Sequence, residues 1–447
     1  MEDRFSSLYD HLEAANAIDA EYFRKPRVKR GLRNADGTGV VAGVTNISNV
    51  HGYVISDDRK MPVDGHLTFR GYDIEDLVEN VFGEGRFGFE EVAYLLMCGK
   101  LPTREELLLF EAAIDEQREL PDGFTEQMIM GTTSVNIMNV LARSVLMLYA
   151  TAPNPEDRSY RNEMMTAISL LSRLPRIMVL AWYAKQAKFH NGSMIIHPFI
   201  PGQDTAETIL SMLRPDRQFT PEEARMLDVL MTLHAEHGGG NNSTFTCRVL
   251  SSADTDPYSA YAAAIGSLKG AKHGGANHKV RAMQAEIKEN VKDWENDDEL
   301  AAYLAKIVNK QAFDHTGLVY GMGHAVYTKS DPRAVICKRY ASKLAEGTEF
   351  EAEYKLLESI ERLSPQVMAQ ERGITKTMCA NIDMYTGFVY NMMGIPEDLY
   401  TPIFACSRMA GWAAHRFEEI ISGKRIMRPA YGTTVLDRPF IFIDDRK

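Results

Sequence analysis

Cysteine is scarce in this chain, and long apolar runs are missing. The five cysteines are scattered without C-x-x-C or paired spacing, which predicts no disulfide framework and a reduced, cytoplasmic setting. They are Cys98, Cys247, Cys337, Cys379 and Cys406. The absence of a run of about eighteen apolar residues predicts that nothing spans a membrane. The opening Met-Glu-Asp-Arg-Phe lacks the basic and apolar parts of a secretory signal, so export is not expected.

Net positive charge is also missing. The formal net charge is −11, which argues against nucleic acid or an anionic membrane as the main partner. One basic run, from Arg24 to Arg30 and on to Arg33, is interpreted as a solvated N-terminal arm. An anionic substrate would therefore have to be met by a local cluster of arginines.

Strand signals are sparse, whereas helix start and stop signals recur. The possible strands are residues 40–47, a hairpin within 53–70, and residues 440–443. Capping patterns begin helices at Thr103, Thr220, Asp256 and Thr401, with stop signals at Gly238–Gly240, Gly270 and Gly423. No regular βαβ alternation or repeat is visible. A chain of 447 residues is long enough for two packed domains, so we predict a mainly α fold with the second domain inserted or tightly packed.

The first polar cluster is H-A-E-H, in which His234 and His237 lie one helical turn apart before a glycine run. Glu236 between them raises the question of zinc. The pattern is not H-E-x-x-H, and no third ligand cluster accompanies it. No metal is therefore expected, and a metallohydrolase built on these three residues is the weaker interpretation.

The second cluster is K-H-G-G-A-N, between a helix that ends at Gly270 and one that begins near Ala276. The helix N-terminus would favour a neutral imidazole at His273. Such a group can donate a hydrogen bond to a developing enolate. A histidine that merely packs in a glycine-rich turn is an equally good interpretation at this point.

Two further clusters complete the set. In G-M-G-H-A-V-Y, Gly321 and Gly323 permit close approach of a ligand to the backbone, and the turn at Asp331-Pro332 lets His324 and Arg333 face one cavity. In N-I-D-M-Y, Asp383 stands in an apolar setting, where it is either a base with a perturbed pKa or a helix cap.

The order of these motifs, followed by S-R and R-P, resembles the citrate synthase family from about Gly65 to Pro429, with a looser match over residues 120–215. The resemblance implies a mainly α, two-domain fold. Residues 1–273 and 391–447 would form a large domain that holds oxaloacetate and the dimer contacts. Residues 274–390 would form a small helical domain that binds acyl-CoA and closes over the substrate. It also implies a homodimer that condenses acetyl-CoA with oxaloacetate and hydrolyses citryl-CoA to citrate and CoA, without cofactor.

The resemblance also implies roles for single residues. The catalytic set would be His273 on the acetyl-CoA enol, His324 on the oxaloacetate ketone, and Asp383 as the base for the methyl proton. Oxaloacetate would be bound by His237, Arg333, Arg408 and Arg428, the last reaching across from the partner subunit. Coenzyme A would meet Val319, Gly321, Gly323 and Lys376.

Three positions depart from the family pattern. Gly238 stands where glutamate is usual, Tyr320 where proline is frequent, and Ala271 where the family has G-P-x-H. The catalytic residue types all remain, so the departures bear on acyl preference, affinity and regulation. 2-Methylcitrate synthase, which uses propionyl-CoA, is the alternative within the family, because one methylene shifts selectivity by only ~1–3 kcal/mol. A non-catalytic acyl-CoA or dicarboxylate sensor is the remoter alternative.

Overall fold

The computed structural model describes residues 16–25, 28–34, 37–56 and 59–446. Their contacts divide them into two units, residues 45–426 and the two terminal segments, 16–44 with 427–446. The terminal unit contains only short helices among its described residues: η2 (Ala20–Arg24), η3 (Arg30–Leu32) and η6 (Ile443–Asp445). Two strand predictions are wrong here. Residues 40–47 and 440–443 have no ladder partner. Phe440 and Phe442 instead contact each other edge to face, and Ile443 begins η6.

The larger unit begins with the predicted hairpin. Strands β1 (Ser48–Ser56) and β2 (Arg59–Phe69) pair antiparallel, and the short β3 (Tyr72–Asp73) extends β2. Glycines in this ribbon allow it to lie directly on the 326–330 segment. A Cβ on Gly52 would lie 2.8 Å from the Val326 carbonyl oxygen, and one on Gly65 would lie 2.1 Å from that of Ser330. The ribbon thus supports the loop that carries His324.

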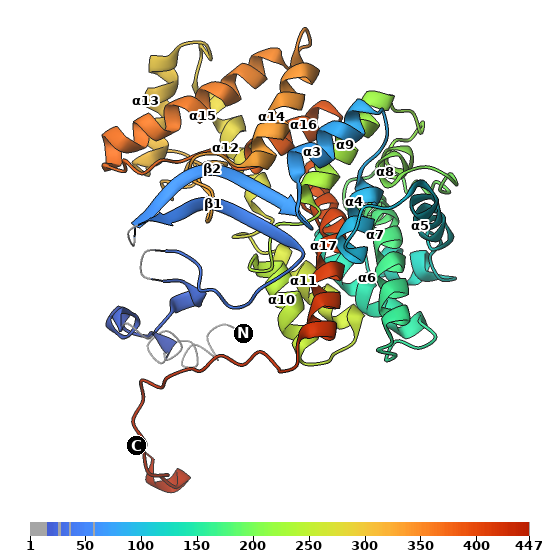
Figure 1. The fold of residues 1–447 in the computed structure, drawn as a ribbon. Helices are drawn as coiled ribbons and strands as arrows, with labels where there is room; N and C mark the ends of the chain where they lie inside the picture. The colour runs from blue at the N-terminus through green and yellow to red at the C-terminus, as the bar shows by residue number, and fades with distance from the viewer. Residues whose placement is uncertain (1–15, 26–27, 35–36, 57–58, 447) are drawn as a thin grey trace. The chain divides into compact units, whose positions relative to one another are not determined.

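One group of helices surrounds a central helix, α17 (Tyr400–Ser422). Figure 1 shows α17 running among α4, α7, α9, α10 and α11, which all pack against it. The other members of this group are α3 (Ile74–Gly83), α4 (Phe89–Cys98), α5 (Arg104–Glu116), η4 (Thr125–Met130), α6 (Ile137–Thr151), α7 (Tyr160–Phe189), α8 (Thr205–Leu213), α9 (Pro221–His234), α10 (Asn242–Ser252), α11 (Pro257–Leu268) and η5 (Glu397–Leu399).

The helix starts at Thr103, Thr220 and Asp256 follow the capping chemistry expected from the sequence, whereas the prediction at Thr401 is wrong, because α17 begins at Tyr400 with Leu399 at its N-cap position. The Thr103 hydroxyl accepts from the Glu106 backbone N–H at 3.2 Å, and the Glu106 carboxylate accepts from the Thr103 N–H at 2.9 Å. The same reciprocal pair forms between Thr220 and Glu223 at the start of α9. This helix ends at His234, four residues before the first glycine of the expected stop signal. The intervening residues are therefore free to form the turn that carries Glu236 and His237.

Helix α7 is long and apolar enough to cross a membrane by length and composition, but 78% of its most apolar window is buried inside the protein. It is tied to α17 by a fully buried ion pair. Both nitrogens of the Arg416 fork donate to Glu163, at 2.7 and 2.6 Å. Because this ion pair is buried between α7 and α17, we interpret α7 as a core helix of the protein.

The second group of helices packs mainly on itself. It consists of α12 (Ala276–Asn290), α13 (Asp297–Val308), α14 (Pro332–Ala345), α15 (Glu351–Arg372) and α16 (Asp383–Met392). In Figure 1 it lies beside the β1–β2 ribbon, and it meets the first group where α14 contacts α3 and α9. Residues 45–426 nevertheless count as one unit, so the boundaries at 274 and 390 stay a prediction.

Candidate active site

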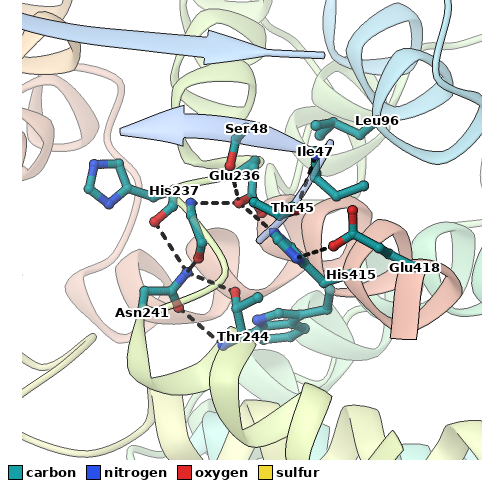
Figure 2. A network of polar contacts seen from close by, with 12 residues as sticks. Thr45, Ile47, Ser48, Leu96, Glu236, His237, Asn241, Thr244, His415 and Glu418 are labelled. Atoms are coloured by element: carbon teal, nitrogen blue, oxygen red, sulfur yellow. Dashed lines mark hydrogen bonds and ion pairs between the residues drawn. The ribbon is translucent and has the colours of Figure 1, made fainter. Parts of the chain in front are cut away.

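A turn at the end of α9 carries the first site residues. Gly238 has φ +83°, a left-handed conformation that strains a residue with a side chain. This conformation suits the glycine found where the family usually has glutamate. Figure 2 shows the His237 ring pointing away from the network around Glu236. The His237 Nε2 atom is buried without a hydrogen-bond partner among the described residues. Because buried polar atoms are normally hydrogen-bonded, this nitrogen is available to bind a ligand.

Helix α17 holds this turn through one stripe of residues. Arg408 donates from Nε to the His234 carbonyl at 2.6 Å, and Gly411 donates from its backbone N–H to the Ala235 carbonyl at 3.2 Å. One turn further, His415 Nε2 lies 2.8 Å from Glu236 Oε1. Positions 408, 411 and 415 share a helix face, so α17 fixes consecutive residues of the turn.

His273 has its tautomer set by Ser243 at the start of α10. The Ser243 backbone N–H, which can only donate, points to His273 Nε2 at 3.4 Å, and the Ser243 hydroxyl lies 2.9 Å from the same atom. Trp412 Nε1 donates to that hydroxyl at 3.2 Å. The acceptor Nε2 leaves the proton on Nδ1, which can donate to a substrate oxygen.

His324 shows the opposite tautomer. Its Nδ1 accepts from the backbone N–H groups of Val326 and Tyr327, both at 3.1 Å. The proton therefore lies on Nε2. The His324 ring stacks on Tyr327 with centroids 4.7 Å apart and meets His237 edge to face at 5.1 Å. The first and third sequence clusters thus come together in space.

All of these imidazoles are neutral near pH 7. Burial and then the charge of Arg408 lower the pKa of His273 to about 4. Burial and then Arg333 lower the pKa of His324 to about 4. The same two influences place the pKa of His237 well below its ordinary value. The sequence predicted a neutral His273 from the helix N-terminus, and the structure adds burial and Arg408 as causes of its lowered pKa.

Two buried arginines face the histidines, and they differ in whether a carboxylate pairs directly with the guanidinium charge. Arg333 is paired bidentately with Asp331, at 3.1 Å through Nε and 2.7 Å through one Nη. No carboxylate among the described residues lies within ion-pair distance of Arg408, and its second Nη is buried without a partner. Burial, opposed by Glu236, lowers the pKa of Arg408 to about 10. An unpaired buried guanidinium is a strong anion-binding group.

Asp383 is the first residue of α16 and does not cap the helix, since the N-cap position is Ile382. Asn277 Nδ2 donates to its Oδ1 at 3.5 Å and to Thr386 Oγ1 at 2.6 Å. Burial raises the pKa of Asp383 to about 6, although Arg333 and Asn277 act to lower it. A carboxylate with this pKa is well matched to act as a general base near neutral pH.

The remaining predicted residues fall outside this cluster. Val319 is buried, and Gly321 and Gly323 adopt φ +84° and +87° in the loop before His324, held by hydrogen bonds to the 379–381 segment. Lys376 is exposed between α15 and α16. Arg428 is exposed in the terminal unit. Their roles stay predictions.

The site carries further residues that the sequence motifs did not single out. Asp331 and Asn277 lie within quoted motifs but were given no role. Ser243 and His415 were missed, although the spacing of Arg408, Gly411 and His415 is helical and could have been noticed. Tyr320, which replaces the frequent proline, donates from its hydroxyl to Asp314 at 2.7 Å and so ties down the loop before Gly321.

The zinc interpretation finds no support in the geometry. Glu236 Oε1 is engaged with Ser48, Gly238 and His415, while the His234 ring lies on Phe404 at 4.5 Å. Within the described part of the chain, no group of three or more histidine, cysteine or acidic side chains could hold a metal ion.

The arrangement defines an enzyme site that can remove a weakly acidic proton beside an anionic substrate. It joins a buried carboxyl group of raised pKa, two neutral imidazoles of opposite tautomer and two buried guanidinium groups, all on a mainly α fold. A family model described as citrate synthase, C-terminal domain, matches residues 34–430. The chain belongs to the citrate synthase family and is an acyltransferase of that type.

Individual proteins of similar sequence or fold carry the names of this family. The chain is 34% identical to a citrate synthase of Synechocystis sp., over 88% of each chain. It is 32% identical to a 2-methylcitrate synthase of Shewanella oneidensis, over 81% of this chain and 87% of that one. In fold it matches the citrate synthase of Thermoplasma acidophilum in its complex with carboxymethyl coenzyme A and oxaloacetate, with a TM-score of 0.74, 24% identity, and 94% and 100% of the two chains covered.

Proposed function

We propose that this enzyme condenses acetyl-CoA with oxaloacetate and hydrolyses the resulting citryl-CoA to citrate and CoA. The observation that carries the proposal is the pair of neutral histidines whose tautomers are set by backbone N–H groups, placed with Asp383 and two buried arginines. Each group then has one step to perform, and the scheme needs no metal or cofactor, because the CoA thioester is a substrate.

In the first step Asp383 takes a proton from the thioester methyl group. Such a carbon acid is far weaker than a carboxylic acid, so the enolate oxygen must be stabilised as it forms. The Nδ1–H of His273 supplies that hydrogen bond. A neutral donor suits this task, since its strength grows with the charge that develops on the oxygen.

In the second step the enol carbon forms a bond to the ketone carbon of oxaloacetate. The Nε2–H of His324 stabilises charge on the ketone oxygen, and Arg333 and Arg408 fix the substrate carboxylates. The alkoxide takes up one proton to give citryl-CoA, which balances the proton that Asp383 removed in the first step. Water then cleaves the thioester, and CoA leaves as the thiol. We further propose that residues 274–390 close over the substrates, which would limit premature hydrolysis of the thioester.

The charge of the site supports a homodimer in which Arg428 of the partner subunit completes the oxaloacetate pocket. In the larger unit the cations Arg333 and Arg408 are already balanced by the carboxylates of Asp331 and Glu236. A dianionic substrate requires additional positive charge. Apolar side chains that a second copy would cover are exposed on α5, α6 and α7: Leu108, Leu109, Leu146, Met147, Tyr160 and Met165.

Binding of coenzyme A is proposed at the 316–323 loop, including Val319, Gly321 and Gly323, with Lys376 meeting a phosphate. A cytoplasmic location is proposed from the cysteines, since all five are free thiols, three of them buried.

The similarity to a 2-methylcitrate synthase keeps propionyl-CoA as the second candidate donor. The test is to measure kcat/KM with oxaloacetate and either donor by following loss of thioester absorbance. We expect acetyl-CoA to be the faster donor. Faster turnover with propionyl-CoA would assign the enzyme to the methylcitrate branch. Oxaloacetate binding without turnover of either donor would favour the sensor.

A further inference from the structure

The carboxylate of Glu236 is completely buried and lies at the centre of a hydrogen-bond network (Figure 2). Its Oε1 accepts from the Gly238 backbone N–H at 2.6 Å, from Ser48 Oγ at 2.8 Å and from His415 Nε2 at 2.8 Å. Its Oε2 is buried and has no partner among the described residues. Three hydrogen bonds on one oxygen are enough to keep the group in place, but they leave half of its charge without direct compensation.

His415 contributes to the compensation: against the effect of burial, first His415 and then Arg408 lower the pKa of Glu236 to about 2. Arg248 Nη1 lies 3.0 Å from His415 Nδ1, and a guanidinium can only donate. Arg248 therefore favours the arrangement in which His415 Nδ1 accepts and Nε2 donates to Glu236. The positive charge of Arg248 is itself paired with Glu418 and Glu419, at 2.8 and 2.9 Å.

Arg408 is the guanidinium group whose charge compensates that of Glu236 at a distance. It leaves α17 one turn before Gly411, and a Cβ on Gly411 would lie 2.3 Å from Glu236 Oε2. Both side chains thus flank the same short stretch of α17, each with one unpartnered buried atom, Arg408 Nη2 and Glu236 Oε2. Neither reaches the other, so their charges interact through the protein without a hydrogen bond that would occupy the Arg408 fork.

We propose that Glu236 is a positioning and affinity-setting residue of the dicarboxylate pocket. It holds the turn that presents His237, and its charge balances Arg408 in the empty site while leaving the guanidinium free to bind. The negative charge then opposes the incoming dianion and weakens oxaloacetate binding. This inference rests on the proposed function, because it requires that Arg408 binds a substrate carboxylate.

The matched test compares Glu236→Gln with Glu236→Asp and Glu418→Gln. Glutamine keeps the acceptor oxygen for Ser48, Gly238 and His415 but removes the charge. Aspartate keeps the charge. Glu418→Gln removes a carboxylate from the far side of His415. Oxaloacetate affinity is measured by calorimetry on the full-length enzyme, together with KM for both substrates and kcat.

We expect Glu236→Gln to bind oxaloacetate about tenfold more tightly, as expected for removing one buried like charge, with KM for acyl-CoA unchanged. Glu418→Gln should stay within about twofold of the wild type, inside the ordinary scatter of charge effects. Glu236→Asp, which keeps the charge but shortens the side chain that holds the turn, should not bind oxaloacetate more tightly than the wild type. A purely structural role for Glu236 predicts weaker binding in both Glu236 variants. Unchanged or weaker binding in Glu236→Gln therefore overturns the proposal.

Glu236→Gln leaves Arg408 unbalanced and can impair folding of the ligand-free enzyme. Oxaloacetate would then replace the missing counter-charge, so its addition should raise the melting temperature of this variant more than that of the wild type. A variant that oxaloacetate does not stabilise counts against the inference. If the wild type itself neither binds oxaloacetate nor turns over, the proposed function has failed instead.

Discussion

Replacing Asp383 with asparagine separates catalysis from binding and from stability. The substitution keeps the shape of the side chain and its contact with Asn277, but removes the group proposed to take the methyl proton. Loss of a general base costs about 10²–10⁴ in rate, so kcat should fall at least a hundredfold. Oxaloacetate affinity, measured by calorimetry, should change little, since Arg333 and Arg408 remain.

The raised pKa of Asp383 means that the same substitution should increase the stability of the folded protein while it lowers activity. Folding raises the pKa from 3.8 to about 6, so the folded state favours the protonated form. The stabilising contribution of that form is complete below pH 3.8 and is lost as pH rises through 6. At neutral pH the ionised group costs at most about 3 kcal/mol, from roughly two units at 1.36 kcal/mol each. Asp383→Asn should therefore raise the melting temperature at pH 7.5 and have no such effect at pH 4.

The pH dependence of kcat/KM in the wild-type enzyme tests the assignment of Asp383 as the base. The logarithm of kcat/KM for acyl-CoA should fall on the acid side with a midpoint near pH 6, because the base must be ionised. Asn277→Ala removes a hydrogen bond that favours the carboxylate, so the midpoint should move to higher pH. A midpoint that stays put in Asn277→Ala, or an Asp383→Asn enzyme that loses oxaloacetate binding as fully as turnover, would refute the assignment of Asp383 as the base.

Two further predictions concern the core and the dimer. Glu163→Gln should destabilise the protein by about 3–5 kcal/mol, because it leaves Arg416 buried without a counter-charge; calorimetric melting checks this, and the exposed Lys100→Met change should leave the melting temperature unaltered. Mixing Arg428→Ala with Asp383→Asn subunits should recover up to about a quarter of wild-type turnover, because half of the randomly assorted dimers each have one complete site. Failure of every mixture to recover activity would contradict a site shared between subunits.

The sequence predicted the mainly α fold and the positions of helix starts more successfully than it predicted strands or charge compensation. Capping boxes are local, so the starts of α5 and α9 could be predicted at Thr103 and Thr220. A strand depends on a partner that the local pattern does not reveal. Residues 40–47 and 440–443 therefore failed as strands, whereas the 53–70 hairpin formed because its two halves are neighbours in the chain.

The same distinction applies to the site. Residue types at motif positions could be recognised, because the order of the motifs carries them. The compensation of each charge could not, because it depends on which helix passes behind the motif. Arg333 meets its carboxylate two residues away in the D-P-R turn. Arg408 is balanced by a residue that lies far away in the sequence and makes no direct contact with it.

His273 and His324, the two histidines proposed to be catalytic, show how a fold gives one residue type two different hydrogen-bonding roles. Histidine in sequence carries no information about which nitrogen holds the proton. At His273 a backbone N–H occupies Nε2, and at His324 two backbone N–H groups occupy Nδ1. Backbone amides cannot accept a hydrogen bond and do not titrate, so the tautomers persist over the whole working pH range. A carboxylate partner in their place would favour the imidazolium and raise the pKa. The donors remain neutral because burial and the nearby arginines lower the pKa of both rings, and because their hydrogen-bond partners are backbone N–H groups rather than acidic side chains.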